Sequence, residues 1–241
     1  MNRKRIFWSV GTVLASAVLL WAGEPWKEKP YTEWTAKEVR KVSTNSPWAR
    51  QVRILSGQVD LNQPRQPQGQ QSVPSPEVGA VGGGSGGGGF GGAGGGRIRF
   101  VIQWASSLTV RQARVREQAL RGNLNEEAAA QFLATTPPQH VIIVFGRDMR
   151  GFEEKGREAV QASAYLKLKG SHRKVPPAQV NFITQGPRLV AVEFYFPREQ
   201  EGRPLITREE KKVEFYCESS TAPLSTEFDL RKMTRDGELD L

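Results

Sequence analysis

In the stretch Arg97-Ile98-Arg99-Phe100-Val101-Ile102-Gln103-Trp104, every second residue from Ile98 onward is apolar. This period of two places Ile98, Phe100, Ile102 and Trp104 on one face of a β-strand. A second run, His140 to Gly146, is continuously apolar after its first residue. It predicts a central strand that is covered on both faces. Strands therefore organise this part of the chain, and the segments around them decide the fold class.

Helices are predicted between and after these two strands. One is expected over residues 107–121, and a second over residues 126–134, where Asn125 caps an Ala-rich run. A third is expected from Glu153 to about Lys169. The middle of the chain is therefore predicted to be largely helical.

The last third of the chain changes to short alternating runs. Residues 179–184, 189–196 and 211–218 predict three successive strands in an antiparallel meander, and residues 227–230 predict an edge strand. We therefore expect residues 97–241 to form an α+β domain, with a mainly antiparallel sheet and helices on one face.

Upstream of this domain, residues 57–96 are rich in Gln, Pro and Gly, and more than half of the 25 glycines lie between Gly79 and Gly96. Such a tract cannot bury enough apolar surface to offset its ordering entropy, so we expect a disordered linker. It matches the Gly-x-Ser-x-Gly and Gly-x-Gly-x-x-Gly patterns, the former around Ser85. Those sites need a flanking strand and helix, so the matches predict neither a nucleophile elbow nor a dinucleotide loop.

Residues 24–56 form a short segment with local structure signals of its own. Thr35 and Glu38 have the spacing of a capping box, which predicts a helix over residues 36–43. Alternation over residues 50–55 predicts a strand.

This segment also holds three of the six tryptophans of the chain, Trp26, Trp34 and Trp48. Tryptophan at a protein surface often marks an interface. The sequence leaves two alternatives open. Either the three side chains pack onto the 97–241 domain, or they contact a partner or a membrane surface.

Residues 1–23 resemble an export signal. Arg3, Lys4 and Arg5 precede an uncharged apolar run over residues 6–22, the order of a secretory leader. Leu20 suits cleavage poorly, so the leader predicts either a released protein or one anchored in the inner membrane. No cysteine lies near its end, which excludes a lipoprotein anchor. In both cases the rest of the chain is expected outside the cytoplasm, in the periplasm or secreted.

Charge and cysteine content narrow the function classes. The net charge is +9, but acidic and basic residues are interspersed, which is typical of a solvated surface. We therefore expect no nucleic-acid partner. The single cysteine, Cys217, excludes an intramolecular disulfide and shares a strand face with Val213 and Phe215, so it is predicted to be buried.

Candidate chemistry is sparse. The two histidines, His140 and His172, lack the neighbours of a metal-ligand spacing, so no zinc site, catalytic group or cofactor is predicted. His172 in a polar loop leaves a proton-transfer role open. The densest basic cluster is either a solvated turn or a contact for an anionic polymer. It consists of Lys167, Lys169, Arg173 and Lys174.

The segments Trp34-Thr35 through Glu38-Val39 and Ser46-Pro47-Trp48-Ala49 resemble a group of uncharacterised bacterial exported proteins. These carry a similar pair of segments after a leader and before a Gly-rich linker. The likeness covers about 25 residues and the order of the segments. It implies export and no particular activity or catalytic residue.

These observations favour an exported bacterial envelope protein that acts as a non-enzymatic interaction or structural module, with an unidentified envelope protein as partner. An envelope hydrolase and a binder of anionic polymer are the alternatives. The first would need a polar residue such as His172 to meet a carboxylate in a cleft, and the second would bind less tightly as salt rises.

Overall fold

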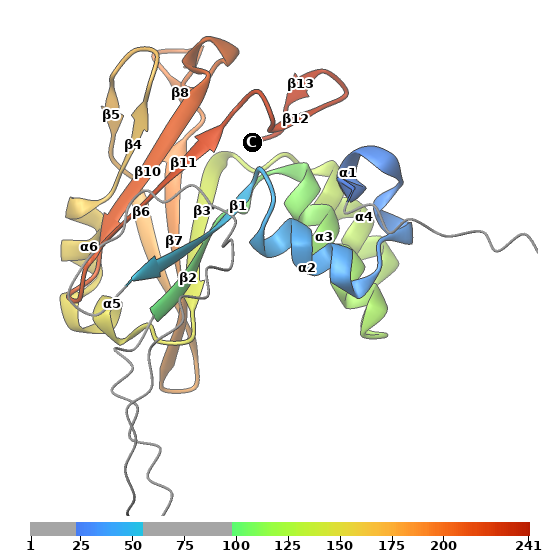
Figure 1. The fold of residues 1–241 in the computed structure, drawn as a ribbon, viewed down its shortest axis with the longest axis horizontal. Coiled ribbons are helices and arrows are strands. Elements are labelled where there is room, and N and C mark those ends of the chain that lie inside the picture. Colours follow the sequence, from blue (N-terminus) through green and yellow to red (C-terminus); the bar gives the residue numbers. More distant parts are fainter. Residues whose placement is uncertain (1–22, 55–97) are drawn as a thin grey trace, which may run out of the picture.

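A computed structural model describes residues 23–54 and 98–241. The linker expected over residues 57–96 and nearly all of the expected leader lie outside these ranges. The described residues form an α+β fold with mainly antiparallel sheets, as predicted (Figure 1).

The larger sheet has five antiparallel strands in the order β1-β2-β3-β7-β6. They are β1 (Ala49–Ile54), β2 (Ile98–Trp104), β3 (Gln139–Gly146), β6 (Gln179–Gln185) and β7 (Arg188–Pro197). In β2, Phe100, Ile102 and Trp104 are buried on one face, which confirms the predicted alternation. The central strand β3 differs from its prediction, because Val141 and Phe145 are only partly buried. Only the opposite face of β3, with His140, Ile142 and Val144, is fully buried.

The smaller sheet has four antiparallel strands in the order β11-β10-β4-β5. They are β4 (Tyr165–Leu168), β5 (Lys174–Val175), β10 (Lys212–Glu218) and β11 (Pro223–Asp229). The predicted three-strand meander is wrong in its last member. β6 and β7 form a hairpin around Gly186, which has a φ of +59°, but β10 pairs with β4 and β11 in the other sheet. Two short hairpins, β8 (Glu199–Gln200) with β9 (Arg203–Pro204) and β12 (Thr234–Arg235) with β13 (Glu238–Leu239), complete the strands.

The two predicted helices after β2 are confirmed as α3 (Leu108–Leu120) and α4 (Glu126–Ala134), and Asn125 caps α4 as expected. The helix predicted over residues 153–169 is wrong in part. Gly156 has a φ of +79° and divides it into α5 (Arg150–Lys155) and α6 (Arg157–Ser163). Its last residues form β4 instead, because Leu166 and Leu168 alternate into the core. Of the described helices, none is both long and apolar enough to cross a bilayer.

The two sheets pack face to face around one apolar core. The Phe194 ring of β7 lies 5.0 Å from the Phe215 ring of β10, and Trp104 of β2 lies 5.2 Å from Phe228 of β11. Cys217 is fully buried in this core, as predicted. Helix α6 contacts both β6 and β10 and so lies between the sheets at one side.

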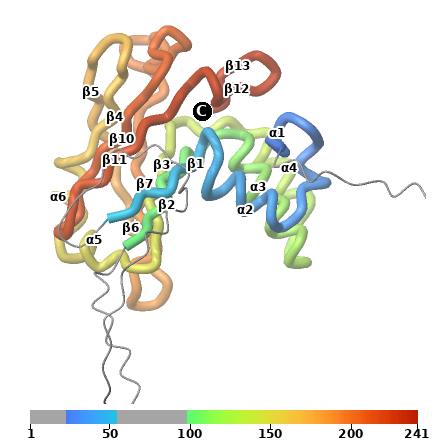
Figure 2. The backbone as a smooth tube through the Cα atoms, viewed as in Figure 1, coloured from blue at the N-terminus to red at the C-terminus, as the bar shows by residue number. Residues whose placement is uncertain are grey.

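The N-terminal segment belongs to the same fold. It contains α1 (Pro25–Glu28), the 3-10 turn η1 (Tyr31–Glu33), α2 (Ala36–Thr44) and β1. The other 3-10 turn among the described residues, η2 (Arg208–Glu210), lies outside this segment and precedes β10. β1 pairs with β2 along its whole length, and α2 packs on α3. Figures 1 and 2 show the blue N-terminal helices beside the green helices α3 and α4. The predicted helix and strand of this segment are therefore confirmed.

Candidate functional site

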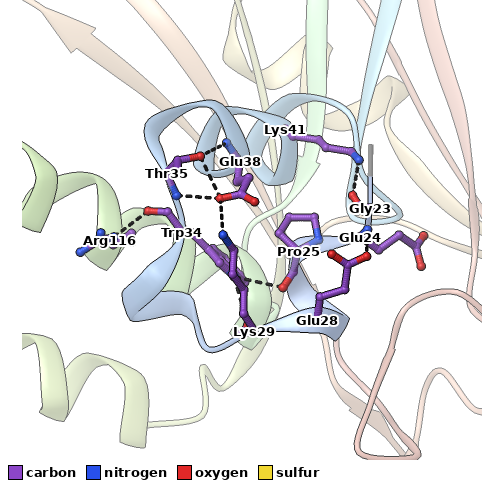
Figure 3. Close-up of polar contacts among 10 residues, drawn as sticks. All are labelled: Gly23, Glu24, Pro25, Glu28, Lys29, Trp34, Thr35, Glu38, Lys41 and Arg116. Carbon is purple, nitrogen blue, oxygen red and sulfur yellow. Dashed lines mark hydrogen bonds and ion pairs between the residues drawn. The ribbon is translucent and has the colours of Figure 1, made fainter. Parts of the chain in front are cut away.

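Trp34 and Trp48 are core residues, with 1% and 0% of their surfaces exposed. The Trp34 indole Nε1 donates hydrogen bonds to the carbonyl oxygens of Pro25, at 3.1 Å, and Lys29, at 3.3 Å. In return Arg116 of α3 donates from Nε to the Trp34 carbonyl oxygen at 2.8 Å (Figure 3). Trp34 thus joins α1 to α3 and offers no surface to a partner.

The capping box next to Trp34 is formed as predicted. The Glu38 carboxylate accepts from the Thr35 backbone N–H and from Lys29 Nζ, at 2.8 and 2.9 Å (Figure 3). Burial acts to raise the pKa of Glu38, but the hydrogen bonds from Thr35 and the ammonium of Lys29 outweigh it and lower the pKa. These contacts stabilise the start of α2.

Trp48 and Trp26 attach the N-terminal segment, residues 23–54, to the rest of the fold. Trp48 Nε1 donates to the Asp240 carbonyl oxygen at 2.7 Å, and the Trp26 ring packs edge-on to the Trp48 ring at 5.7 Å. Trp26 is partly buried and its Nε1 has no hydrogen-bond partner among the described residues. Of the two alternatives left open by the sequence, packing onto the 97–241 domain is the one seen for all three tryptophans.

The C-terminal residues contact both Trp48 and the start of α3, and Figure 2 marks the C-terminus beside the N-terminal segment. The Asp240 carboxylate accepts from the backbone N–H groups of Leu108 and Thr109 at 2.5 and 3.0 Å, and Ser107 Oγ accepts from Val110. These oxygens satisfy the first N–H groups of α3, so the natural anion site at this helix start is already occupied.

The four basic residues of the predicted cluster lie on and beside β4 and β5. Lys169 pairs with Glu214, and the Lys174 ammonium lies 4.3 Å from the centre of the Tyr165 ring. Lys167 and Arg173 form no ion pair within the described ranges. The structure therefore brings the four together, with two of them engaged by neighbours.

Neither histidine contacts a carboxylate in the described part of the chain. His140 is 4% exposed and lies against the Trp104 ring at 5.5 Å. Its burial, aided by the nearby Arg198 guanidinium, lowers its pKa to about 3, so it is neutral at pH 7. His172 is exposed on a turn with a φ of +57°. The described residues also contain no group of three or more His, Cys, Asp or Glu that could hold a metal ion.

Helix α4 stands out because it buries none of its residues, although Glu126–Ala134 contains six apolar side chains. It packs along α3 only in part, and a groove of about 470 Å³ lies between the two helices. The groove has an apolar side and a polar side. Its lining consists of Val115, Ala128, Ala129 and Phe132, and of Arg114, Gln118, Asn123 and Asn125.

Arg114 is the one charged residue in the lining of this groove. No described carboxylate lies within ion-pair distance of it, and its contact with Gln103 Oε1 is long, at 3.4 Å. Burial lowers the pKa of the guanidinium, against the attraction of Glu193 and Glu117 at longer range. Arg114 therefore offers hydrogen-bond donors and positive charge to a ligand in the groove.

Phe132 forms the apolar wall of the groove. Its ring is 41% exposed, and the Arg111 guanidinium lies 4.9 Å from the ring centre on the side toward α3. Arg111 also donates from Nη2 to the Thr135 carbonyl oxygen at 2.6 Å. The end of α4 is therefore held in place while its aromatic side chain stays accessible.

The sequence predicted both helices but not the groove. The available signal was the composition of α4, where Ala128, Ala129, Ala130, Phe132 and Leu133 leave no polar face broad enough for an ordinary surface helix. Comparison with protein-family models, curated proteins and solved structures finds no match for this chain.

Proposed function

We propose that this protein is an exported bacterial envelope protein and a non-enzymatic interaction module. The groove between α3 and α4 binds a partner segment that carries an apolar side chain next to a carboxylate. The observation that carries the proposal is Arg114, a charged residue that forms no ion pair with any described residue and lies in an otherwise uncharged groove.

The chemistry of the lining supports this class of ligand. Val115, Ala129 and Phe132 would bury an apolar side chain, and a carboxylate beside it would reach Arg114. The amides of Gln118 and Asn123 could then bond the backbone of the segment. A partner peptide is favoured over a small cofactor because one wall of the groove is α4, a helix with no buried residue.

Export rests on the leader expected over residues 1–23 and on the resemblance in residues 34–49. Both are sequence-based proposals, as is the choice between a released protein and one anchored through residues 6–22. An envelope hydrolase stays a prediction that depends on His172. An anionic-polymer binder stays a prediction that depends on Lys167 and Arg173.

The test is a titration of the full chain with defined hexapeptides that carry one Leu or Phe next to Asp. The same peptides with Asn in place of Asp serve as the comparison. We expect the Asp peptides to bind about tenfold tighter, as a hydrogen bond to a charged group requires. Arg114→Gln should abolish this preference while the circular dichroism spectrum stays unchanged.

Arg121→Gln is the matched control, because Arg121 directly follows the last residue of α3, pairs with Glu117 and does not line the groove. Ala129→Phe, which fills the groove, should weaken both peptide series. Equal affinity for Asp and Asn peptides, or an Arg114→Gln variant that binds like the wild type, would contradict the proposal.

A further inference from the structure

Strand β6 is an open edge of the five-stranded sheet. It pairs with β7 alone, and in the described ranges its outward backbone groups form no hydrogen bond with another segment. The register shift in this pair leaves Val190 of β7 without a partner, so β6 itself stays regular. A regular row of unpaired N–H and C=O groups is a template for another strand.

The other edges of the two main sheets carry features that discourage such pairing. β1 contains Arg50 and Arg53, β11 begins with Pro223 and contains Glu227, and β5 is two residues long and is followed by two prolines. β6 reads Gln-Val-Asn-Phe-Ile-Thr-Gln and has no charge and no proline over seven residues. Proteins usually protect an edge of this kind, so β6 is the exception.

We propose that β6 pairs with β6 of a second copy of this chain. The pairing is antiparallel around a two-fold axis at Ile183, so that the two five-stranded sheets join into one. In this register Ile183 lies opposite its own counterpart, and Asn181 lies opposite Gln185 of the second copy. A two-fold interface of this type is self-complementary by symmetry.

The composition of β6 favours a second copy as the occupant. In a strand paired with itself, a charge at the two-fold axis would lie directly opposite an identical charge, and β6 carries no charge at any position. Ile183, which is 39% exposed in the single chain, would be buried against its counterpart, and the Asn181 and Gln185 amides could hydrogen bond.

Helix α6 indicates which part of β6 takes part. Gln161 of α6 donates to the Ala178 carbonyl oxygen just before β6, and the Arg157 guanidinium lies 5.9 Å from the centre of the Phe182 ring. Phe182 packs against the core, so Arg157 covers the face of the strand toward the second sheet. The outward backbone groups of residues 181–185 are left uncovered by α6 and stay available for pairing. The proposed interface is separate from the groove between α3 and α4.

The first test is disulfide cross-linking of the full chain in mild detergent. Ile183→Cys places two thiols across the proposed axis, so mild oxidation should give a covalent dimer. Gln51→Cys is the matched control, since Gln51 is exposed on β1, the opposite edge of the same sheet. The native Cys217 is fully buried and does not compete. Equal cross-linking of the two variants overturns the proposal.

The second test is sedimentation of the full chain, whose monomer mass is 26.8 kDa. The wild type should form a dimer, and Ile183→Lys should weaken dimerisation about tenfold or more, because it sets two ammonium groups opposite each other. Thermal unfolding shows whether the variant is folded. A wild type that is monomeric at its highest soluble concentration overturns the proposal, as does a dimer that persists in Ile183→Lys.

Discussion

At the scale of the residue, the three tryptophans show how burial decides between an interface and a core. Trp48 and Trp34 each have a buried indole N–H that donates to a carbonyl oxygen, to that of Asp240 for Trp48 and to that of Pro25 in the same segment for Trp34. The Trp34 carbonyl oxygen in turn accepts from Arg116 of α3. Such a bond contributes little net free energy when formed but costs more when one partner is left unsatisfied. The aromatic residues that suggested a partner surface therefore stabilise the attachment of residues 23–54.

We predict that Trp48→Phe lowers the free energy of unfolding by about 1–3 kcal/mol, because it leaves the buried Asp240 carbonyl oxygen without its donor. Trp26→Phe is the matched variant. The Trp26 indole N–H has no partner in the described residues, so this change should cost less. Denaturant unfolding measures both, and equal losses would argue against the role of the Trp48 hydrogen bond.

At the scale of the element, local signals were predictable and long-range pairings were not. The α2 capping box spans four residues, and the β2 alternation is visible within one strand, so both could be predicted from the sequence. The assignment of β10 to the second sheet depends on pairing with β4, about 45 residues away.

Two other features of the fold were hidden for the same reason. β4 has only four residues, so its alternation was too short to compete with the helical pattern around it. The groove depends on how far α4 lies from α3, which no local sequence pattern encodes. The sequence placed Arg114 on a helix but did not indicate that it lines a binding groove.

The capping box also makes the stability of α2 dependent on pH. The pKa of Glu38 is lowered in the folded chain, so its contribution is present above the ordinary value of 4.5 and is lost as the pH falls through the folded pKa. We predict that Glu38→Gln destabilises the protein by about 0.5–1 kcal/mol at pH 7. Melting temperatures from pH 7 to pH 3 should show this difference shrinking below pH 4.5.

Glu33→Gln is the control for this pH dependence, since Glu33 is exposed in η1 and forms no ion pair with any described residue. It should melt like the wild type across the range. A Glu38→Gln effect that keeps its size at pH 3 would mean that the carboxylate charge is not its source.

At the scale of the whole molecule, residues 23–54 and 98–241 form one folded unit despite the tract between them. Six residue pairs join β1 to β2, and the contacts of Trp34 and Trp48 add a second and a third attachment. The boundary expected from the sequence between residues 24–56 and 97–241 therefore reflects a change in composition. In the fold, the residues on the two sides of this boundary pack against each other.

We predict that proteolysis within residues 55–97 leaves the two fragments bound to each other. They should elute together in size-exclusion chromatography and separate only in denaturant, because β1 is an integral strand of the sheet. Mass spectrometry identifies the cut sites. Fragments that separate under native conditions would show that the attachment is weak.

The register of β1 and β2 places Ile54 directly opposite Ile98. The chain thus leaves the sheet and re-enters it at neighbouring points, so residues 55–97 close a loop whose ends are already held together. Loop-closure entropy rises only with the logarithm of length, and doubling such a loop costs about 0.6 kcal/mol. A fluorescent domain could be inserted there, or the loop shortened to a tight turn, at little cost to the fold.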